Sequence, residues 1–357
     1  MGMSLLAHLA AHDFGYLSTE RLLSRLTASL DSMDGLERYR QHFYNWYDTQ
    51  TLEPLHPHYV STVDSGNLAG LLLTLSVGIR QLADAPMFGP AVVEGLRDTL
   101  DILTEAQGAA SADETVLNEL RKSLEQAPQS SPPEALADLL HAAHLMVTNT
   151  PVDTDEESLY WRDTFVRQCS DWSEELQRFR FPAPLAATYS PPCTLRQLAA
   201  LNPVDWAVDH HAQIKQVRST AERRLETLDR LALLATSLAQ MDFSLLYDNQ
   251  RDLFVIGYNA EDRRLDSGYY DLLASEVRLT NYVAIAQGQI PQRAWFTLGR
   301  LLGENAGVPT LLSWSGSMFE YLMPMLVMPN YDGSLLDQTC RAAVAVQIEH
   351  GNLLGIP

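Results

Sequence analysis

Hydrophobic residues recur along most of the chain every three to four positions, with polar and charged residues between them. This spacing predicts amphipathic helices that bury one face against a core. Because it persists over most of the sequence, an all-α fold is predicted. The segments with this pattern are 3–12, 18–33, 68–82, 158–179, 211–240, 268–287, 291–303, 316–328 and 332–349.

The sharpest stripe lies in segment 158–179, inside a region of different character that runs from 86 to 210. This region has Pro and Ser clusters at 128–133 and 182–192, with acidic helical segments between them. It is predicted to be a divergent helical insertion, and its stripe a packing face. The stripe residues, at steps of four, three, four and three, are Phe165, Cys169, Trp172, Leu176 and Phe179.

The helical pattern is interrupted between residues 242 and 260. Two runs rich in β-branched and aromatic residues flank the polar stretch Asp248–Asp252. Such a pattern predicts a β-hairpin with its turn in the polar stretch.

The composition is that of a packed protein and narrows the class of partner. The 357 residues are 46% hydrophobic and 20% charged, and 25 basic against 45 acidic residues give a net charge of −20. A field of this sign repels phosphate backbones, so nucleic-acid binding is not expected. The same negative field does not repel a neutral partner such as a sugar.

The cysteines, the amino terminus and the hydrophobic segments indicate in which cellular compartment the chain is expected. Cys169, Cys193 and Cys340 are far apart and form no C-x-x-C pair, which fits a reducing compartment. The amino terminus lacks the basic start of a signal peptide. No apolar run approaches ~20 residues, so no membrane-spanning segment is predicted.

Glu276 is the first candidate for chemistry. In a helix over 268–287, Tyr269, Leu272 and Glu276 share one face, so the carboxyl would project inward; Asp271 would lie about 140° around the helix. The alternative is a helix-surface acid paired with Arg278 or another base.

Glu320 is the second candidate. It is the only charged residue between Asn305 and Tyr331, and its neighbours are apolar or aromatic. Burial there would raise the carboxyl pKa, which suits a general acid. The alternative is a structural acid that caps a neighbouring helix.

A third segment combines aromatic residues with polar ones. Aromatic faces in a loop suit stacking on sugar rings, and the polar groups nearby suit hydrogen bonds to hydroxyls. For Asp64 the alternative is a helix N-cap. The aromatic residues are Trp46, Tyr47 and Tyr59, and the polar ones are Asn45, Asp48 and Asp64.

Metal and cofactor sites are not predicted. His56 and His58, or His210 and His211, are potential ligands, but no paired Cys, His or acid spacing supports them. The chain also lacks G-x-G-x-x-G, Walker and G-x-S-x-G motifs.

Five segments resemble a known family, in the same order along the chain. They are YNWYDTQTLEPL, YVSTVDSGNLAG, SGYYDLLASEVRLTNYVAIAQG, LLSWSGSMFEYLMPMLV and LLDQTCRAAVAVQIEHG. They resemble the glycoamylase-like domain of bacterial cyclic β-1,2-glucan synthases, glycoside hydrolase family 189, which is related to the endo-β-1,2-glucanases of family 144.

The resemblance implies an (α/α)6 barrel that converts linear β-1,2-glucan into a ring by retaining transglycosylation. In the synthase this domain lies beside a membrane-embedded glucosyltransferase and a phosphorylase-like module, on the cytoplasmic side of the bacterial inner membrane. About eight of twelve barrel helices are found in residues 1–357, so a truncated barrel is expected. The family pattern continues past Pro357 with a loop that resembles the source of the acid/base carboxyl.

Matched motif by motif, the resemblance implies Glu276 as nucleophile and Glu320 as a second catalytic or substrate-binding group. An endo-β-1,2-glucanase and a non-catalytic glucan-binding module remain alternatives. The residues implied to line the glucan cleft are Trp46, Tyr47, Asp48, Asp64, Tyr269, Tyr270, Asp271 and Trp314.

Overall fold

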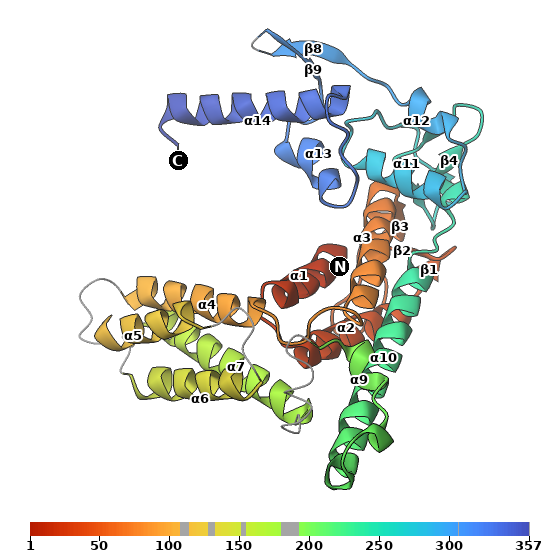
Figure 1. The fold of residues 1–357 in the computed structure, drawn as a ribbon. Coiled ribbons are helices and arrows are strands. Elements are labelled where there is room, and N and C mark those ends of the chain that lie inside the picture. Colours follow the sequence, from red (N-terminus) through yellow and green to blue (C-terminus); the bar gives the residue numbers. More distant parts are fainter. Residues whose placement is uncertain (108–113, 128–132, 151–154, 180–192, 306, 357) are drawn as a thin grey trace. The chain divides into compact units, whose positions relative to one another are not determined.

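The computed structural model describes residues 1–107, 114–127, 133–150, 155–179, 193–305 and 307–356. Over these residues the protein is mostly helical, with 63% helix in 13 α-helices and several small antiparallel sheets (Figure 1). The predicted helical class is confirmed. The chain divides into two compact units, one of residues 1–2, 32–74 and 235–357, the other of residues 3–31 and 75–234.

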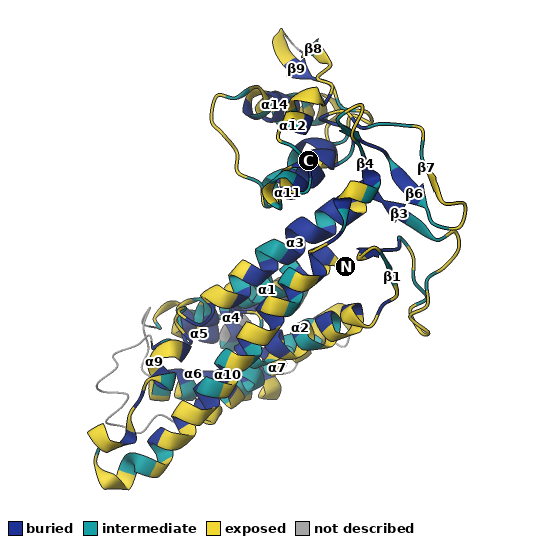
Figure 2. Ribbon diagram, turned by 90° about the vertical axis from the view of Figure 1, so that its right-hand side faces the viewer, coloured by how far each residue is buried: buried dark blue, intermediate teal, exposed yellow. Residues whose placement is uncertain are grey.

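The second unit contains four helices that pack around a shared core. Helix α4 packs on α5 and α7, and α6 packs on the same two helices. Buried and exposed positions alternate along these helices, as expected for amphipathic segments (Figure 2). The helices of this unit are α1 (Gly2–Asp13), α2 (Thr19–Asp34), α4 (Ala91–Gln107), α5 (Glu114–Glu125), α6 (Pro133–Asn149), α7 (Glu156–Phe179), α9 (Leu195–Ala199) and α10 (His211–Leu238).

The stripe predicted in 158–179 is confirmed. All five of its residues are buried on α7. Trp172, one of them, also donates its indole N–H to the carbonyl of Gly15 at 2.9 Å, so the ring's polar atom is satisfied inside the core. The Pro- and Ser-rich stretches 128–132 and 182–192 lie outside the described residues.

A buried ion pair crosses the second unit. The guanidinium of Arg224 on α10 contacts both carboxylate oxygens of Glu175 on α7, one at 2.7 Å, and Glu20 on α2 at 3.1 Å. The side chains of Arg224 and Glu175 are 6% and 1% exposed. Charges so deep in a protein are tolerated only when they are paired.

The first unit combines helices with short strands. Its three-stranded sheet has the order β3-β6-β7, and β3 pairs with β6 so that Val60 faces Tyr258. The strands are β1 (Arg38–Tyr39), β2 (His42–Phe43), β3 (Tyr59–Ser61), β4 (Tyr247–Asp248), β5 (Leu253–Phe254), β6 (Gly257–Asn259), β7 (Arg264–Leu265), β8 (Leu302–Asn305) and β9 (Val308–Leu311). The helices are α3 (Thr62–Gln81), α11 (Val277–Ala286), α12 (Arg293–Thr297), α13 (Met318–Leu322) and α14 (Leu335–Leu354).

Two glycines allow the close packing of this unit. A Cβ on Gly257 would lie 2.1 Å from the Tyr59 hydroxyl, so the sheet position next to β3 admits only glycine. A Cβ on Gly66 would lie 2.6 Å from the Cα of Thr280. Helices α3 and α11 therefore approach each other closely near their amino-terminal ends.

The polar stretch Asp248–Asp252 joins β4 to β5 in an antiparallel hairpin, within the predicted range 242–260. Strand β6 follows in the same range, but it pairs with β3 and β7 instead.

Two helix predictions are wrong in part. Residues 268–276 are not helical, because Tyr269 bridges Val255 and the N–H of Tyr270 bonds the carbonyl of Phe254. Segment 291–303 contains only the short α12, and its end forms β8, which pairs with β9 through a turn at Gly307. Backbone partners distant in sequence override the local helical spacing in both places.

Helix α3 is long and apolar enough to cross a membrane by length and composition alone. However, 67% of that window is buried inside the protein, as in a core helix. This is weak grounds for a membrane span.

Candidate functional site

Glu276 lies at the point where an irregular segment becomes helix α11. Ser275, just before it, has φ +49°, in the left-handed region, and this turns the chain into the helix. Glu276 occupies the N-cap position and its side chain makes no capping bond. The residue is 5% exposed. The Glu276 carboxyl therefore lies buried at the start of α11 and is not used to cap this helix.

Two nearby groups define the surroundings of this carboxyl. The hydroxyl of Ser275 donates to Oε2 of Glu276. Arg278 is buried, and its guanidinium donates to the backbone carbonyls of Glu320 at 2.7 Å and of Tyr321. Because Glu276 is buried, the alternative of a surface acid is wrong. The guanidinium of Arg278 bonds these carbonyls; burial lowers the pKa of Arg278, and the charge of Glu276 opposes that shift.

Tyr270 brings acids from separate segments together. Its ring is buried, and burial raises the pKa of the phenol; the charges of Asp64, Glu276 and Asp266 raise it further. The pKa of this phenol therefore responds to acids from α3, from the 266–271 segment and from the start of α11.

Trp314 covers Tyr270 in a stacked arrangement. Their ring centroids are 5.7 Å apart with 24° between the planes. The indole N–H of Trp314 donates to Asp271 at 3.1 Å, which fixes the ring's orientation. Trp314 is 53% exposed, so part of its indole remains available to a ligand. The structure thus brings Glu276, Asp64, Tyr270, Asp271 and Trp314 into one region.

Asp266 was missed by the sequence reasoning. It accepts a 2.5 Å hydrogen bond from the hydroxyl of Tyr59 on β3. Burial, followed by this bond, raises the pKa of the Tyr59 phenol. The only signal for Asp266 was its place directly before the Ser267-Gly268 turn that leads to Tyr269 and Tyr270.

Asp64 does not cap α3. The helix begins at Thr62, and the N–H of Asp64 donates to the hydroxyl oxygen of Ser61 at 3.3 Å. The Asp64 carboxylate is exposed and accepts a 3.4 Å bond from the side-chain amide of Asn45. This bond joins Asp64 to the loop that contains Asn45, Trp46 and Tyr47, called here the aromatic loop.

Other residues predicted to line a cleft have different positions. Asp48 accepts bonds from the N–H groups of Thr51 and Gln50, at 2.8 Å each, which lower its pKa and close a turn. The hydroxyl of Tyr47 accepts the Tyr44 N–H and donates to the Glu37 carbonyl. Tyr47 and Asp48 thus shape the loop.

Trp46 is exposed and Tyr269 is half-buried, and neither contacts Tyr270 or Trp314 through a described hydrogen bond. Trp46 is 48% exposed. Tyr269 donates its hydroxyl to Asp248 at 2.7 Å, and the guanidinium of Arg251 lies 4.9 Å from its ring centroid.

Glu320 is buried on α13, but the expectation of a raised pKa is wrong. Its Oε1 accepts the Ser275 N–H, and its Oε2 accepts the N–H and hydroxyl of Ser315. Burial pushes the pKa of Glu320 upward, but the bonds from Ser315, Ser275 and Ser313 together hold it below its usual value. Both oxygens are used to tie the Ser275 segment to the loop before α13, which favours a structural role.

Glu320→Gln is expected to cost about 2–3 kcal/mol of folding free energy at neutral pH, because a charged acceptor of three bonds is lost. The folded-state pKa lies below the unfolded value, so the contribution is complete above that value, about 4.3, and is lost as pH falls through the folded-state pKa. Urea unfolding of both proteins across this range measures the difference, with Glu349→Gln on exposed α14 as control. An unchanged difference at low pH would contradict the assignment.

A large apolar cavity is separate from these acids. Its volume is about 640 Å³, and its lining includes Tyr282, Trp295, Phe296 and Tyr331. None of the carboxylates near Tyr270 lines it. Volume alone therefore does not identify the place with the chemistry, and the converging acids are the better guide.

Over its whole length the chain is homologous to a segment of an enzyme, a cyclic β-1,2-glucan synthase. That relative is the cyclic β-(1,2)-glucan synthase NdvB of Rhizobium meliloti (strain 1021), which is 35% identical over 360 residues. The alignment covers all of this chain but 12% of NdvB, consistent with one module of a larger synthase. No family model matches the chain.

Proposed function

We propose that this chain is part of the glycoamylase-like, (α/α)6-barrel module of a cyclic β-1,2-glucan synthase, and that this module closes linear β-1,2-glucan into a ring. The homology to a segment of NdvB supports the relation to the synthase. The observation that carries the finer proposal is the buried Glu276 carboxyl, whose charge raises the pKa of Tyr270, together with the stack of Tyr270 and Trp314. A carboxylate beside an aromatic platform is the arrangement expected where a sugar ring is held and attacked.

In the proposed reaction, the Glu276 carboxylate attacks the anomeric carbon of a glucosyl unit. The β-1,2 bond breaks, and the departing 2-hydroxyl takes a proton from a second carboxyl. The 2-hydroxyl at the other end of the same glucan then attacks the glucosyl ester, and its proton returns to the second carboxyl. Glu276 is released, no water is consumed, and the β configuration is retained.

Glu276 is a better nucleophile candidate than Glu320. Both oxygens of Glu320 accept hydrogen bonds from Ser275 or Ser315, whereas the bond from Ser275 occupies Oε2 of Glu276. A nucleophile needs an oxygen that can reach the substrate. In this proposal Glu320 acts indirectly, by holding the backbone of Ser275 next to Glu276.

The test is product analysis of the full-length synthase that carries this chain, supplied with linear β-1,2-glucan. Ring closure yields products one water lighter than the linear glucan of equal length, and these have no reducing end. Linear products of shorter length would instead indicate an endo-β-1,2-glucanase. Binding without any product would indicate a glucan-binding module and would refute the catalytic proposal.

Trp314→Ala is expected to weaken binding of linear β-1,2-glucan by about tenfold, since a stacking face worth roughly 1–1.5 kcal/mol is lost. Isothermal titration with the chain itself measures this without requiring turnover. Phe296→Ala is the matched control, because Phe296 is a 70% exposed aromatic residue of the same unit that lines the separate cavity. Equal losses in both variants would contradict a sugar platform at Trp314.

A further inference from the structure

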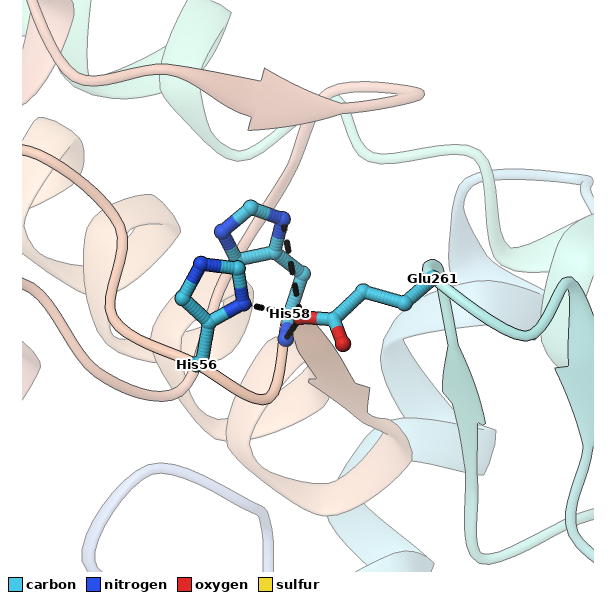
Figure 3. A group of neighbouring side chains, drawn as sticks. All are labelled: His56, His58 and Glu261. Carbon is cyan, nitrogen blue, oxygen red and sulfur yellow. Dashed lines mark hydrogen bonds and ion pairs between the residues drawn. The ribbon is translucent and has the colours of Figure 1, made fainter.

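Two histidines and a glutamate gather at one end of the three-stranded sheet in the first unit. Nδ1 of His56 lies 2.6 Å from Oε1 of Glu261, and Nδ1 of His58 lies 3.9 Å from the same oxygen. The potential ligand atoms of all three residues lie within 4.8 Å of one another. Figure 3 shows both rings beside the carboxylate.

The backbone holds these residues in place. His56 and His58 lie two positions apart, just before β3, and Glu261 lies just after β6, the strand that pairs with β3. The N–H of Ala260 donates to the His58 carbonyl at 2.8 Å, and the N–H of His58 donates to the Glu261 carboxylate at 2.8 Å. The site is therefore built on paired strands rather than on a free loop.

The turn that carries Glu261 is itself fixed. The side-chain oxygen of Asn259 accepts the N–H groups of Glu261 and Asp262, at 2.9 and 3.0 Å. This turn fixes the backbone that carries the Glu261 carboxylate. Metal ligands are commonly held in position by such groups outside the coordination sphere.

We propose that His56, His58 and Glu261 bind a divalent transition-metal ion of the Zn²⁺ type. Two imidazole nitrogens and one carboxylate oxygen are the ligands of Zn²⁺ sites that keep a position open for water, whereas Mg²⁺ and Ca²⁺ prefer oxygen alone. The sequence marked His56 and His58 as potential ligands but showed no acid near them, because Glu261, which completes the site, lies 203 positions from His58.

Small side-chain rotations convert the present arrangement into a coordination sphere. In a tetrahedral site with bonds of about 2.0–2.1 Å, ligand atoms lie roughly 3.3 Å apart, between the two distances observed. The imidazole rings are stacked, with centroids 4.4 Å apart and 13° between planes, so one ring must turn to point its lone pair at the ion. The His56 side chain, 78% exposed, is free to make this rotation.

A bound Zn²⁺ ion would link residues 46–58 of the aromatic loop to the three-stranded sheet β3-β6-β7. His56 and His58 end the segment that begins near Trp46, and Leu55 bonds back to the Trp46 carbonyl at 2.9 Å. The inference concerns this loop and does not depend on the proposed sugar chemistry.

Titration of chelator-treated protein with ZnCl2, followed by calorimetry, tests the proposal. We expect one Zn²⁺ per chain with a dissociation constant in the low micromolar range or tighter, and no heat with MgCl2. His56→Ala and Glu261→Gln are each expected to weaken Zn²⁺ binding by at least about tenfold. His350→Ala, which removes an exposed histidine on α14, is expected to bind as the unchanged protein does.

Hydrogen exchange gives a second measurement that needs no enzyme activity. Zn²⁺ is expected to slow exchange of amides in residues 46–58, and Glu261→Gln is expected to abolish the slowing. Circular dichroism establishes that each variant is folded. The proposal is overturned if Zn²⁺ binds only at millimolar concentration, or if His56→Ala and Glu261→Gln bind it as tightly as His350→Ala does.

Discussion

Glu276→Gln is expected to lower ring formation by the full-length synthase at least about 10³-fold, while the chain still binds linear β-1,2-glucan. Glutamine keeps the shape of the side chain but cannot form the glucosyl ester. The residue is 5% exposed and lies at the start of α11 without capping it, so the helix does not depend on its charge. The measurement is the initial rate of cyclic product, with glucan affinity determined in parallel.

Two further variants make this result specific. Glu304→Gln changes an exposed acid on β8 and is expected to leave the rate unchanged. Glu276→Ala opens space for an external anion, so added azide is expected to restore glycosidic bond cleavage and to give an α-glucosyl azide, because a single displacement inverts the anomeric centre. A Glu276→Gln rate within about tenfold of the unchanged synthase would show that Glu276 is not the nucleophile.

The second large effect concerns stability. Glu175→Ala is expected to destabilise the second unit by about 3–5 kcal/mol, because the buried guanidinium of Arg224 loses its main partner. That guanidinium is 6% exposed, and its centre also lies 5.0 Å from the ring centroid of Phe179. The contact with Glu20, whose side chain is 45% exposed, cannot replace the bidentate pair. Urea unfolding and hydrogen exchange in α7 and α10 measure the loss.

The controls for this prediction separate buried charge from lost contact. Glu222→Ala removes an exposed partner of Arg218 on the same helix and is expected to cost less than about 1 kcal/mol. Replacing both buried partners, as in Glu175→Leu with Arg224→Met, is expected to recover much of the stability, because no unpaired charge remains. If Glu175→Ala is as mild as Glu222→Ala, the buried pair contributes little.

Glu276 is buried as the sequence predicts, but not on the helix that the sequence predicts. Its inward position was predicted from a helical stripe, yet the residues before it are not helical. The carboxyl is buried because Ser275 turns the chain and because Tyr269 and Tyr270 pair with the strand end at Val255 and Phe254. The expected burial is correct for a reason that local spacing did not contain.

Glu320 gives the opposite case. Its isolation among apolar residues correctly predicted burial, but not the direction of the pKa shift. That direction depends first on the hydroxyl of Ser315 and then on the N–H of Ser275, which is 45 residues away. A carboxyl pKa reflects the balance of burial and hydrogen bonds. Of the two, only burial can be judged from the neighbouring residues in the sequence.

The sequence by itself determined the helical class and the buried stripe of α7, because helical periodicity acts over a few residues and directly specifies which face is apolar. It also marked Glu276, Tyr270 and Trp314, through their place in ordered motifs. Only the tertiary structure decided how Asp64, Asp266 and Glu276 converge on Tyr270, how Glu320 is anchored, and that His56 and His58 meet Glu261. These arrangements join segments up to about two hundred residues apart, and such contacts follow from chain packing rather than from local spacing.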